Sequence, residues 1–297
     1  MRFGWTLPAC ICFSFMKIKI LTVAVFLFSF PAWSQDNQAR TLLKKMLDAC
    51  DDVRSAKFIL NSTERELNGK IESSEIIIKM QTAPLKIYLY MIHPNPGAEC
   101  LWKKDESNNK VLINPNGFPY INLKLSPYNS LLRRDSHHLI PEIGFDYIAS
   151  MTKYYLHKMS DSFFSYLQVT DTLLWDKRIC YELTFDFTSF QYVDYTVKMN
   201  ETLTSIAAQF HLSDFVLLRS NRKVRDYDSV KPGQVIKIPN FYNWKIVFYI
   251  DHINYLPLVQ TVYDEKGLFE KYELKSFILN PVIQQEEFQS SYPDYGF

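Results

Sequence analysis

Residues 195–239 read YTVKMNETLTSIAAQFHLSDFVLLRSNRKVRDYDSVKPGQVIKIP, and the rest of the chain is organised around this stretch. A short strand pattern begins at Tyr195, and Thr202 is a good N-cap for a helix. Apolar residues then recur at helical spacing up to Phe210, and Ser213 can cap a second short helix. After a charged loop, a Pro-Gly turn leads into a closing strand. The pattern predicts a β-α-α-β unit.

The stretch resembles the LysM module, whose pattern is Y-x-V-x-x-G-D-T-L, then I-A-x-x-F, L, N and finally P-G-Q-x-I-x-I-P. The matching positions are Tyr195, Val197, Thr202, Leu203, Ile206, Ala207, Phe210, Asn221, Pro232, Gly233, Gln234, Ile236, Ile238 and Pro239. Asn200 and Glu201 stand where the pattern has Gly and Asp. Because Asn tolerates a positive φ best after Gly, we expect the turn to survive.

The resemblance implies a glycan site. LysM modules hold N-acetylated sugar chains, such as peptidoglycan or chitin, between the first strand-helix turn and the loop before the closing strand. Backbone donors and a small apolar contact, which such loops supply, suit an N-acetyl group. The implied contact residues are Met199, Asn200, Glu201, Thr202, Asp228, Ser229, Val230 and Lys231. The alternative is a degenerate module that serves as a spacer or a protein contact.

The N-terminal 34 residues read as a secretory signal peptide. They contain three basic residues and no acid, and a short apolar run precedes a small-residue end with cleavage after Ser34. Met16 is an alternative start. The apolar run is too short for a confident membrane span. We therefore expect an exported, periplasmic protein with no stable membrane span.

Strand periodicity lies on both sides of the LysM-like stretch. Residues 36–50 predict an amphipathic helix, Asn68-Gly69 predicts a hairpin turn, and Pro141 opens a predicted helix that ends near residue 158. Alternating apolar residues elsewhere indicate an antiparallel sheet with one apolar face. The residues from 284 onward are expected to lie along the surface.

The sequence thus predicts an α+β fold with an insertion. Residues 35–192 and 241–297 are expected to form one domain, a curved antiparallel sheet with covering helices, and residues 193–240 the inserted module. Because the first and last strands of the module pair, its ends lie close together and can leave from a hairpin tip.

The sheet domain resembles the LolA/LolB lipoprotein-carrier fold, an unclosed antiparallel half-barrel lidded by helices. The resemblance rests on Ile250-Asp251, Leu256-Pro257-Leu258, Tyr263-Asp264, Gly267, Tyr272, Leu274 and Asn280-Pro281. An uncharacterised exported bacterial branch of that group is still more similar, through residues 84–91, 97–103, Glu142-Ile143-Gly144 and the ending Pro293-Asp294-Tyr295-Gly296-Phe297.

The LolA-like resemblance implies an apolar cavity for a lipid or a lipoprotein acyl chain. The inward positions that would line it are Ile78, Leu85, Ile87, Leu89, Phe185, Phe187, Ile246 and Phe248. The alternative is that these residues fill a closed core, which is the commoner outcome for an apolar stripe.

The sequence carries no recognisable catalytic motif. It has no H-E-x-x-H, nucleophile elbow, P-loop or dinucleotide fingerprint, and eight glycines leave little material for phosphate-binding loops. His137-His138 is expected to be a surface loop rather than a metal pair. We predict a protein that is not an enzyme and holds no metal or cofactor. A cell-wall hydrolase is the less favoured alternative, because its paired carboxylates need not be close in sequence.

The net charge argues against a nucleic-acid partner, and the cysteine content limits the possible disulfides. Without the leader the net charge is near −2, which gives no strongly basic face for nucleic acid. Cys50, Cys100 and Cys180 remain after cleavage. Export permits one disulfide among them, although small buried apolar side chains are the favoured interpretation.

Overall fold

The computed structural model describes residues 32–118, 120–133 and 136–297, with side chains from residue 37 onward. The predicted signal peptide and the choice of start lie, up to residue 31, outside the described residues. Within the described ranges, no helix is both long enough and apolar enough to span a membrane.

A large antiparallel sheet forms the body of the protein. Within the described residues it has eleven strands in the order β6-β5-β4-β3-β2-β1-β13-β12-β11-β8-β7. The strands are β1 (Ser55–Arg65), β2 (Ile71–Thr82), β3 (Leu85–His93), β4 (Glu99–Lys103), β5 (Val111–Asn114), β6 (Leu123–Leu125), β7 (Leu167–Trp175), β8 (Arg178–Asp186), β11 (Lys245–Asp251), β12 (Pro257–Asp264) and β13 (Gly267–Leu279).

The sheet is completed by pairing its first strand with its last. β1 and β13 lie side by side with Ser62 opposite Tyr272, so the N-terminal and C-terminal strands share one surface. The predicted hairpin at Asn68-Gly69 is confirmed: it joins β1 to β2, and Gly69 has a φ of 90°. β8 and β11 are also neighbours, with Phe185 opposite Ile246, and the module is inserted between them.

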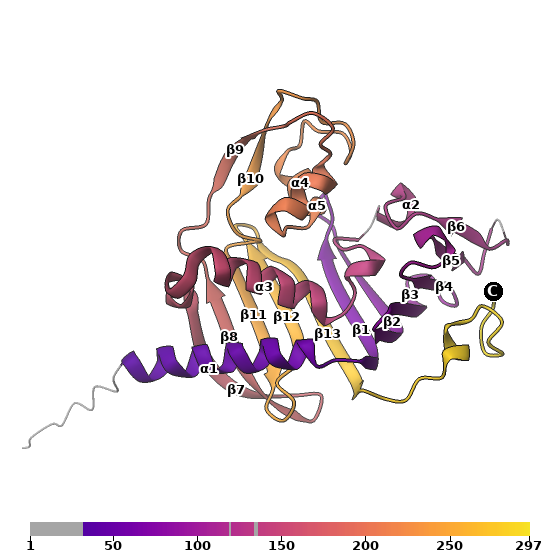
Figure 1. Cartoon of the computed structure of the whole chain (residues 1–297), viewed down its shortest axis with the longest axis horizontal. Helices are drawn as coiled ribbons and strands as arrows, with labels where there is room; N and C mark the ends of the chain where they lie inside the picture. Colours follow the sequence, from indigo (N-terminus) through magenta and orange to yellow (C-terminus); the bar gives the residue numbers. More distant parts are fainter. Residues whose placement is uncertain (1–31, 119, 134–135) are drawn as a thin grey trace, which may run out of the picture. The chain divides into compact units, whose positions relative to one another are not determined.

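Two helices pack on one face of the sheet, α1 (Ala32–Asp51) and α3 (Phe145–Met159) (Figure 1). The predicted start of α3 at Pro141 was wrong. Pro141 lies in the 3₁₀ turn η2 (Ile140–Glu142), and α3 begins only after Gly144. Gly144 has φ 118° and ψ −158°, a conformation that residues with a Cβ avoid.

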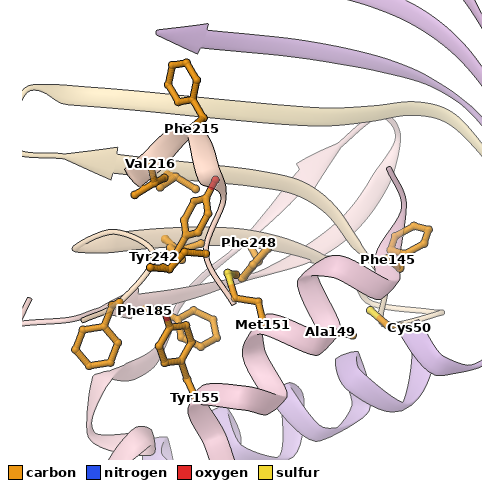
Figure 2. Close-up of a cluster of buried hydrophobic side chains, with 14 of the residues drawn as sticks. Cys50, Phe145, Ala149, Met151, Tyr155, Phe185, Phe215, Val216, Tyr242 and Phe248 are labelled. Atoms are coloured by element: carbon orange, nitrogen blue, oxygen red, sulfur yellow. The ribbon is translucent and has the colours of Figure 1, made fainter. Parts of the chain in front are cut away.

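The aromatic core lies between α3 and the sheet. Figure 2 shows Met151 and Tyr155 of α3 beside Phe185 of β8 and Phe248 of β11, and all four side chains are almost fully buried. Shorter turns complete the domain: η1 (Ser107–Asn109), α2 (Ser130–Arg133), η3 (Ser160–Tyr166) and η4 (Gln285–Phe288).

The C-terminal residues lie along the sheet, as predicted. Tyr295 stacks on Tyr88 of β3 at 3.8 Å between ring centroids, and the amide of Gly296 donates to Glu99 Oε2 at 2.9 Å. Phe288 is fully buried beneath them.

The inserted module is the predicted β-α-α-β unit, built from β9 (Tyr192–Thr196), α4 (Leu203–Phe210), α5 (Asp214–Ser220) and β10 (Val235–Pro239). β9 and β10 pair antiparallel. Thr202 caps α4 by accepting from the Ser205 amide at 3.1 Å, and Ser213 caps α5 by accepting from the Phe215 amide at 3.2 Å. The α+β fold with its inserted module is therefore confirmed.

Candidate functional sites

The two loops predicted to bind glycan lie against each other. The amide of Leu203, at the end of the first loop, donates to the carbonyl of Tyr227 in the second at 2.9 Å. The predicted residues Met199, Asn200, Asp228 and Lys231 are exposed, Glu201, Thr202 and Ser229 are partly buried, and Val230 is buried. The structure thus places the two predicted sets side by side.

The first loop is held in shape by its own side chains. Asn200 has a φ of 62°, as expected where Asn replaces Gly. The carboxylate of Glu201 accepts from Tyr195 Oη at 2.8 Å, from the Lys198 amide at 2.8 Å and from Gln209 Nε2 at 3.0 Å. Burial alone would raise the pKa of Glu201, but these hydrogen bonds, led by that from Gln209, lower it. Glu201 therefore supports the loop, while Met199 and Asn200 face solvent.

Buried charges fix the module to the sheet domain. Arg133 is 5% exposed and pairs with Asp214 of α5. It also donates to Thr204 Oγ1 of α4 at 3.0 Å, and its Cζ lies 3.4 Å from the ring centroid of Tyr227. On the same module, Arg219 pairs with Asp264 of β12, which is 1% exposed. The module leaves from a hairpin, as predicted, but it also packs back on the sheet.

His137 belongs to this junction and not to the surface, so the prediction of an exposed His-His loop was wrong. Its ring, 3% exposed, stacks between Phe215 of the module and Phe269 of β13, with centroid distances of 4.0 and 4.4 Å. Nδ1 lies 2.7 Å from Glu270 Oε2, and Nε2 lies 3.1 Å from the carbonyl oxygen of Arg65. An oxygen atom within hydrogen-bonding distance of each ring nitrogen explains why a His is tolerated there.

His138 faces the other way, toward the sheet domain. Nδ1 lies 3.3 Å from Glu142 Oε2, and Nε2 lies 3.6 Å from Glu270 Oε1 and 3.3 Å from Tyr242 Oη. Burial alone would lower the pKa of His138, but the charges of Glu270 and Glu142 raise it well above its usual value. Burial would raise the pKa of Glu270, yet His138 and His137 hold it at about 2. The pair is therefore ionised at neutral pH.

A pocket of about 90 Å³ adjoins His138, between the start of α3 and strands β1, β12 and β13. It is mostly apolar with a few polar groups at one end, which is the usual composition of a small-molecule site. The lining residues are Phe58, Leu60, His138, Glu142, Ile143, Gly144, Phe145, Tyr147, Ile148, Pro257, Gln260, Tyr272 and Leu274.

A family model described as "Protein of unknown function (DUF1571)" matches residues 53–203, just over half of the chain. The chain belongs to the DUF1571 family. A LysM domain model matches residues 195–239, the stretch that the structure folds as β9-α4-α5-β10. Comparison with curated proteins gives no match.

Solved structures align with this DUF1571 protein over most of its length at low identity. A crystal structure of MucB is 13% identical, with 85% of this chain and 62% of that chain covered and a TM-score of 0.43. The chain thus spans less than two thirds of MucB. The lipoprotein LppX of Mycobacterium tuberculosis is 12% identical, with coverages of 84% and 98% and a TM-score of 0.40. A LolA superfamily protein from Nitrosomonas europaea is 9% identical, with coverages of 86% and 98% and a TM-score of 0.34.

None of the residues predicted to line an apolar cavity lines the 90 Å³ pocket of this DUF1571 protein. Leu85 is partly buried, and the remaining predicted residues are buried. A void of only about 10 Å³ lies among Phe185, Phe187, Ile246 and Phe248 of the sheet, where Met151 and Tyr155 of α3 pack against them (Figure 2). The 90 Å³ pocket beside His138 is lined by a different set of residues.

Sequence reasoning missed the residues around the pocket of this DUF1571 protein. The available signal was the break between Pro141 and Gly144, which delays the helix and leaves space beneath its first turn. The His pair was the second signal, because the two rings enter the interior from one connection.

The three cysteines show no disulfide in the described part of the chain. Cys50, Cys100 and Cys180 are free, and burial raises their pKa values to about 12, 12 and 11. Cys50 and Cys180 are buried and Cys100 is partly buried, and a raised pKa disfavours the thiolate form of each.

Proposed function

We propose that this protein is a non-enzymatic protein of the cell envelope that binds peptidoglycan-type glycan through its LysM module. The observation that carries the proposal is the contact between the two loops. It includes the hydrogen bond that the Leu203 amide donates to the Tyr227 carbonyl. A shallow groove between these loops needs both of them at one place, and the fold brings them there.

The exposed groups suit an N-acetylated sugar. Met199 is 75% exposed and offers an apolar contact for an acetyl methyl group. Asn200 is exposed with a free side-chain amide in the described structure, and Lys231 is exposed on the facing loop. Docking through Arg133 leaves Met199, Asn200 and Lys231 exposed, which supports binding by the docked module.

The cellular location follows from the sequence. The basic, then apolar, then small-residue leader favours export, and glycan of this type lies outside the cytoplasmic membrane. We therefore place the protein in the periplasm.

Sedimentation with insoluble peptidoglycan tests the glycan proposal. The double variant Met199→Glu, Lys231→Glu changes one exposed residue on each loop, and we expect its affinity to fall at least about tenfold, which is about 1.4 kcal/mol. Val235→Ser is the matched control, because Val235 is 59% exposed on β10 of the same module and outside the two loops. Equal pelleting of the double variant and wild type would favour the alternative, a structural or protein-contact module.

A second candidate function belongs to the sheet domain, and the 90 Å³ pocket favours it. Apolar side chains from β1, β13 and α3 surround a space that they do not fill. We infer that the sheet domain holds an apolar group there. The pocket of about 90 Å³ accommodates a short segment of a lipid or an apolar molecule smaller than benzene, which occupies a cavity of about 150 Å³. Binding of xenon gas, followed by its NMR shift, tests this point, and Ile148→Trp, which fills the pocket, should abolish it.

A further inference from the structure

One residue of the pocket lining carries a buried hydroxyl group with no partner. Tyr147 lines the pocket from the first turn of α3, and its Oη is buried and makes no hydrogen bond within the described residues. Leaving a buried hydroxyl unsatisfied is energetically costly, so such groups are rare in native proteins. Burial, followed by the nearby carboxylates, raises the pKa of Tyr147 well above its usual value. The hydroxyl is therefore neutral and able both to donate and to accept.

A second polar group of the pocket is only half used. Glu142 Oε2 accepts from the Leu139 amide at 3.0 Å and lies 3.3 Å from His138 Nδ1. Glu142 Oε1 makes no hydrogen bond within residues 32–118, 120–133 and 136–297. The side chain is 25% exposed and lines the pocket, so this oxygen is an available acceptor.

Two further polar side chains of the lining, His138 and Tyr272, are already engaged. Both ring nitrogens of His138 face Glu142, Glu270 and Tyr242, and the hydroxyl of Tyr272 donates to Glu64. The carboxylates of Glu64, Glu142 and Glu270 outnumber the imidazoles of His137 and His138. A positive or hydrogen-bond-donating group therefore meets a favourable field here, and an added carboxylate meets repulsion.

The opposite end of the pocket is apolar and short. Phe58, Leu60 and Leu274 from the sheet face Phe145 and Ile148 from α3. The volume of about 90 Å³ is below the roughly 150 Å³ that holds benzene, so it fits a body of only a few carbon atoms.

We propose that this pocket binds a small amphiphile whose head is a primary amine, with an alcohol as the weaker alternative, and whose body is a short apolar chain. The head donates to Glu142 Oε1 and exchanges a hydrogen bond with Tyr147 Oη, while the body lies against Leu60, Ile148 and Leu274. A free carboxylate head is rejected. The proposal rests on the second candidate function, that the pocket holds an apolar group.

Three probes with one three-carbon chain test the head group: n-propylamine, 1-propanol and propanoate. Each is titrated into the full chain at neutral pH, and binding is followed by two-dimensional NMR. We expect affinity in the order amine, alcohol, carboxylate, with the amine at least about tenfold tighter than propanoate. Tyr147→Phe removes one neutral hydrogen bond and should weaken amine binding roughly three- to tenfold. Glu142→Gln should remove the preference for amine over carboxylate.

Tyr154→Phe is the matched control, because Tyr154 lies on the same helix and outside the pocket lining. It should leave all three affinities unchanged. Tyr147→Phe should keep or raise the melting temperature of wild type, since it removes a buried hydroxyl that has no partner to lose.

The results separate the two proposals. Propanoate binding as tightly as propylamine, or unchanged amine binding by Tyr147→Phe, overturns the head-group assignment. If xenon binds and none of the three probes does, the apolar pocket stands and the amine proposal fails. If neither xenon nor any probe binds, both fail. Peptidoglycan sedimentation by Tyr147→Phe should equal that of wild type in every case.

Discussion

The hydroxyl of Ser213 donates to the backbone carbonyl of His137 at 2.7 Å. Ser213 is the N-cap of α5 in the LysM module, and His137 precedes the residue that faces the pocket. The residue that caps α5 therefore also attaches the module to the sheet domain. His137 lies at the junction with the module, and His138 lines the candidate pocket.

We expect Ser213→Ala to lower the free energy of unfolding by about 1–3 kcal/mol. The change removes a helix cap, worth about 0.5–2 kcal/mol, and leaves a buried carbonyl without its donor. Urea denaturation followed by circular dichroism measures the change. Ser205→Ala is the control: it weakens the cap of α4, whose contacts lie inside the module, and a loss as large as that of Ser213→Ala would contradict the attachment role of Ser213.

The pair Arg133–Asp214 is buried, and breaking it should be costly. Arg133→Met or Asp214→Leu alone strands the other charge, and we expect each to cost about 3–5 kcal/mol. The double variant removes both charges and should cost clearly less than the sum of the two. A double-mutant cycle by chemical denaturation gives the coupling. Strict additivity would show that the pair makes no contact in solution.

The ion pairs Arg133–Asp214 and Arg219–Asp264 complicate deletion of the module. The closeness of its ends suggests that residues 193–240 can be removed and the sheet domain left folded. However, Arg133 and Asp264 would lose their partners Asp214 and Arg219. Point variants on the exposed loops are therefore the cleaner test of glycan binding.

Stability should depend on pH through His138 and Glu270. The raised pKa of His138 contributes stability that is fully present below its unfolded value, about 6.5, and is lost as pH rises above it. The lowered pKa of Glu270 contributes stability present above the unfolded value, about 4.3, and lost as pH falls toward about 2. The contributions overlap between pH values of about 4.5 and 6.5.

Urea midpoints at pH 5.5 and pH 8.5 check this sign. Wild type should be less stable at the higher pH, and His138→Gln should show a smaller difference between the two. An equal difference in wild type and variant would assign the pH dependence to other groups.

The core beneath α3 should behave as closed. Phe185 adjoins a void of only about 10 Å³, so Phe185→Ala should cost about 3–5 kcal/mol. Leu89→Trp, at a side chain that is 6% exposed, should overpack its surroundings and cost roughly 1–3 kcal/mol. Thermal and chemical denaturation of both variants test the packing. A Phe185→Ala variant close to wild type in stability would reveal a larger cavity there, as the acyl-carrier resemblance implies.

The sequence by itself determined the elements whose decisive contacts are local. The caps at Thr202 and Ser213 join residues only two or three positions apart, and the positive φ of Asn200 is a property of one residue. The module could therefore be predicted from its sequence motif. The Asn68-Gly69 turn and the two-residue period likewise predicted strands and a hairpin, because both signals act between neighbours.

Only the tertiary structure decided where the buried charges meet. Arg133 and Asp214 are 81 positions apart, and His137 and Glu270 are 133 apart. They come together because β1 pairs with β13 and the module packs back against that part of the sheet. Periodicity reports which face of a strand is apolar, but not which distant partner covers it. For that reason the sequence predicted an apolar stripe, whereas the pocket beside His138 and Tyr147 became visible only once the strands and the delayed helix were in place.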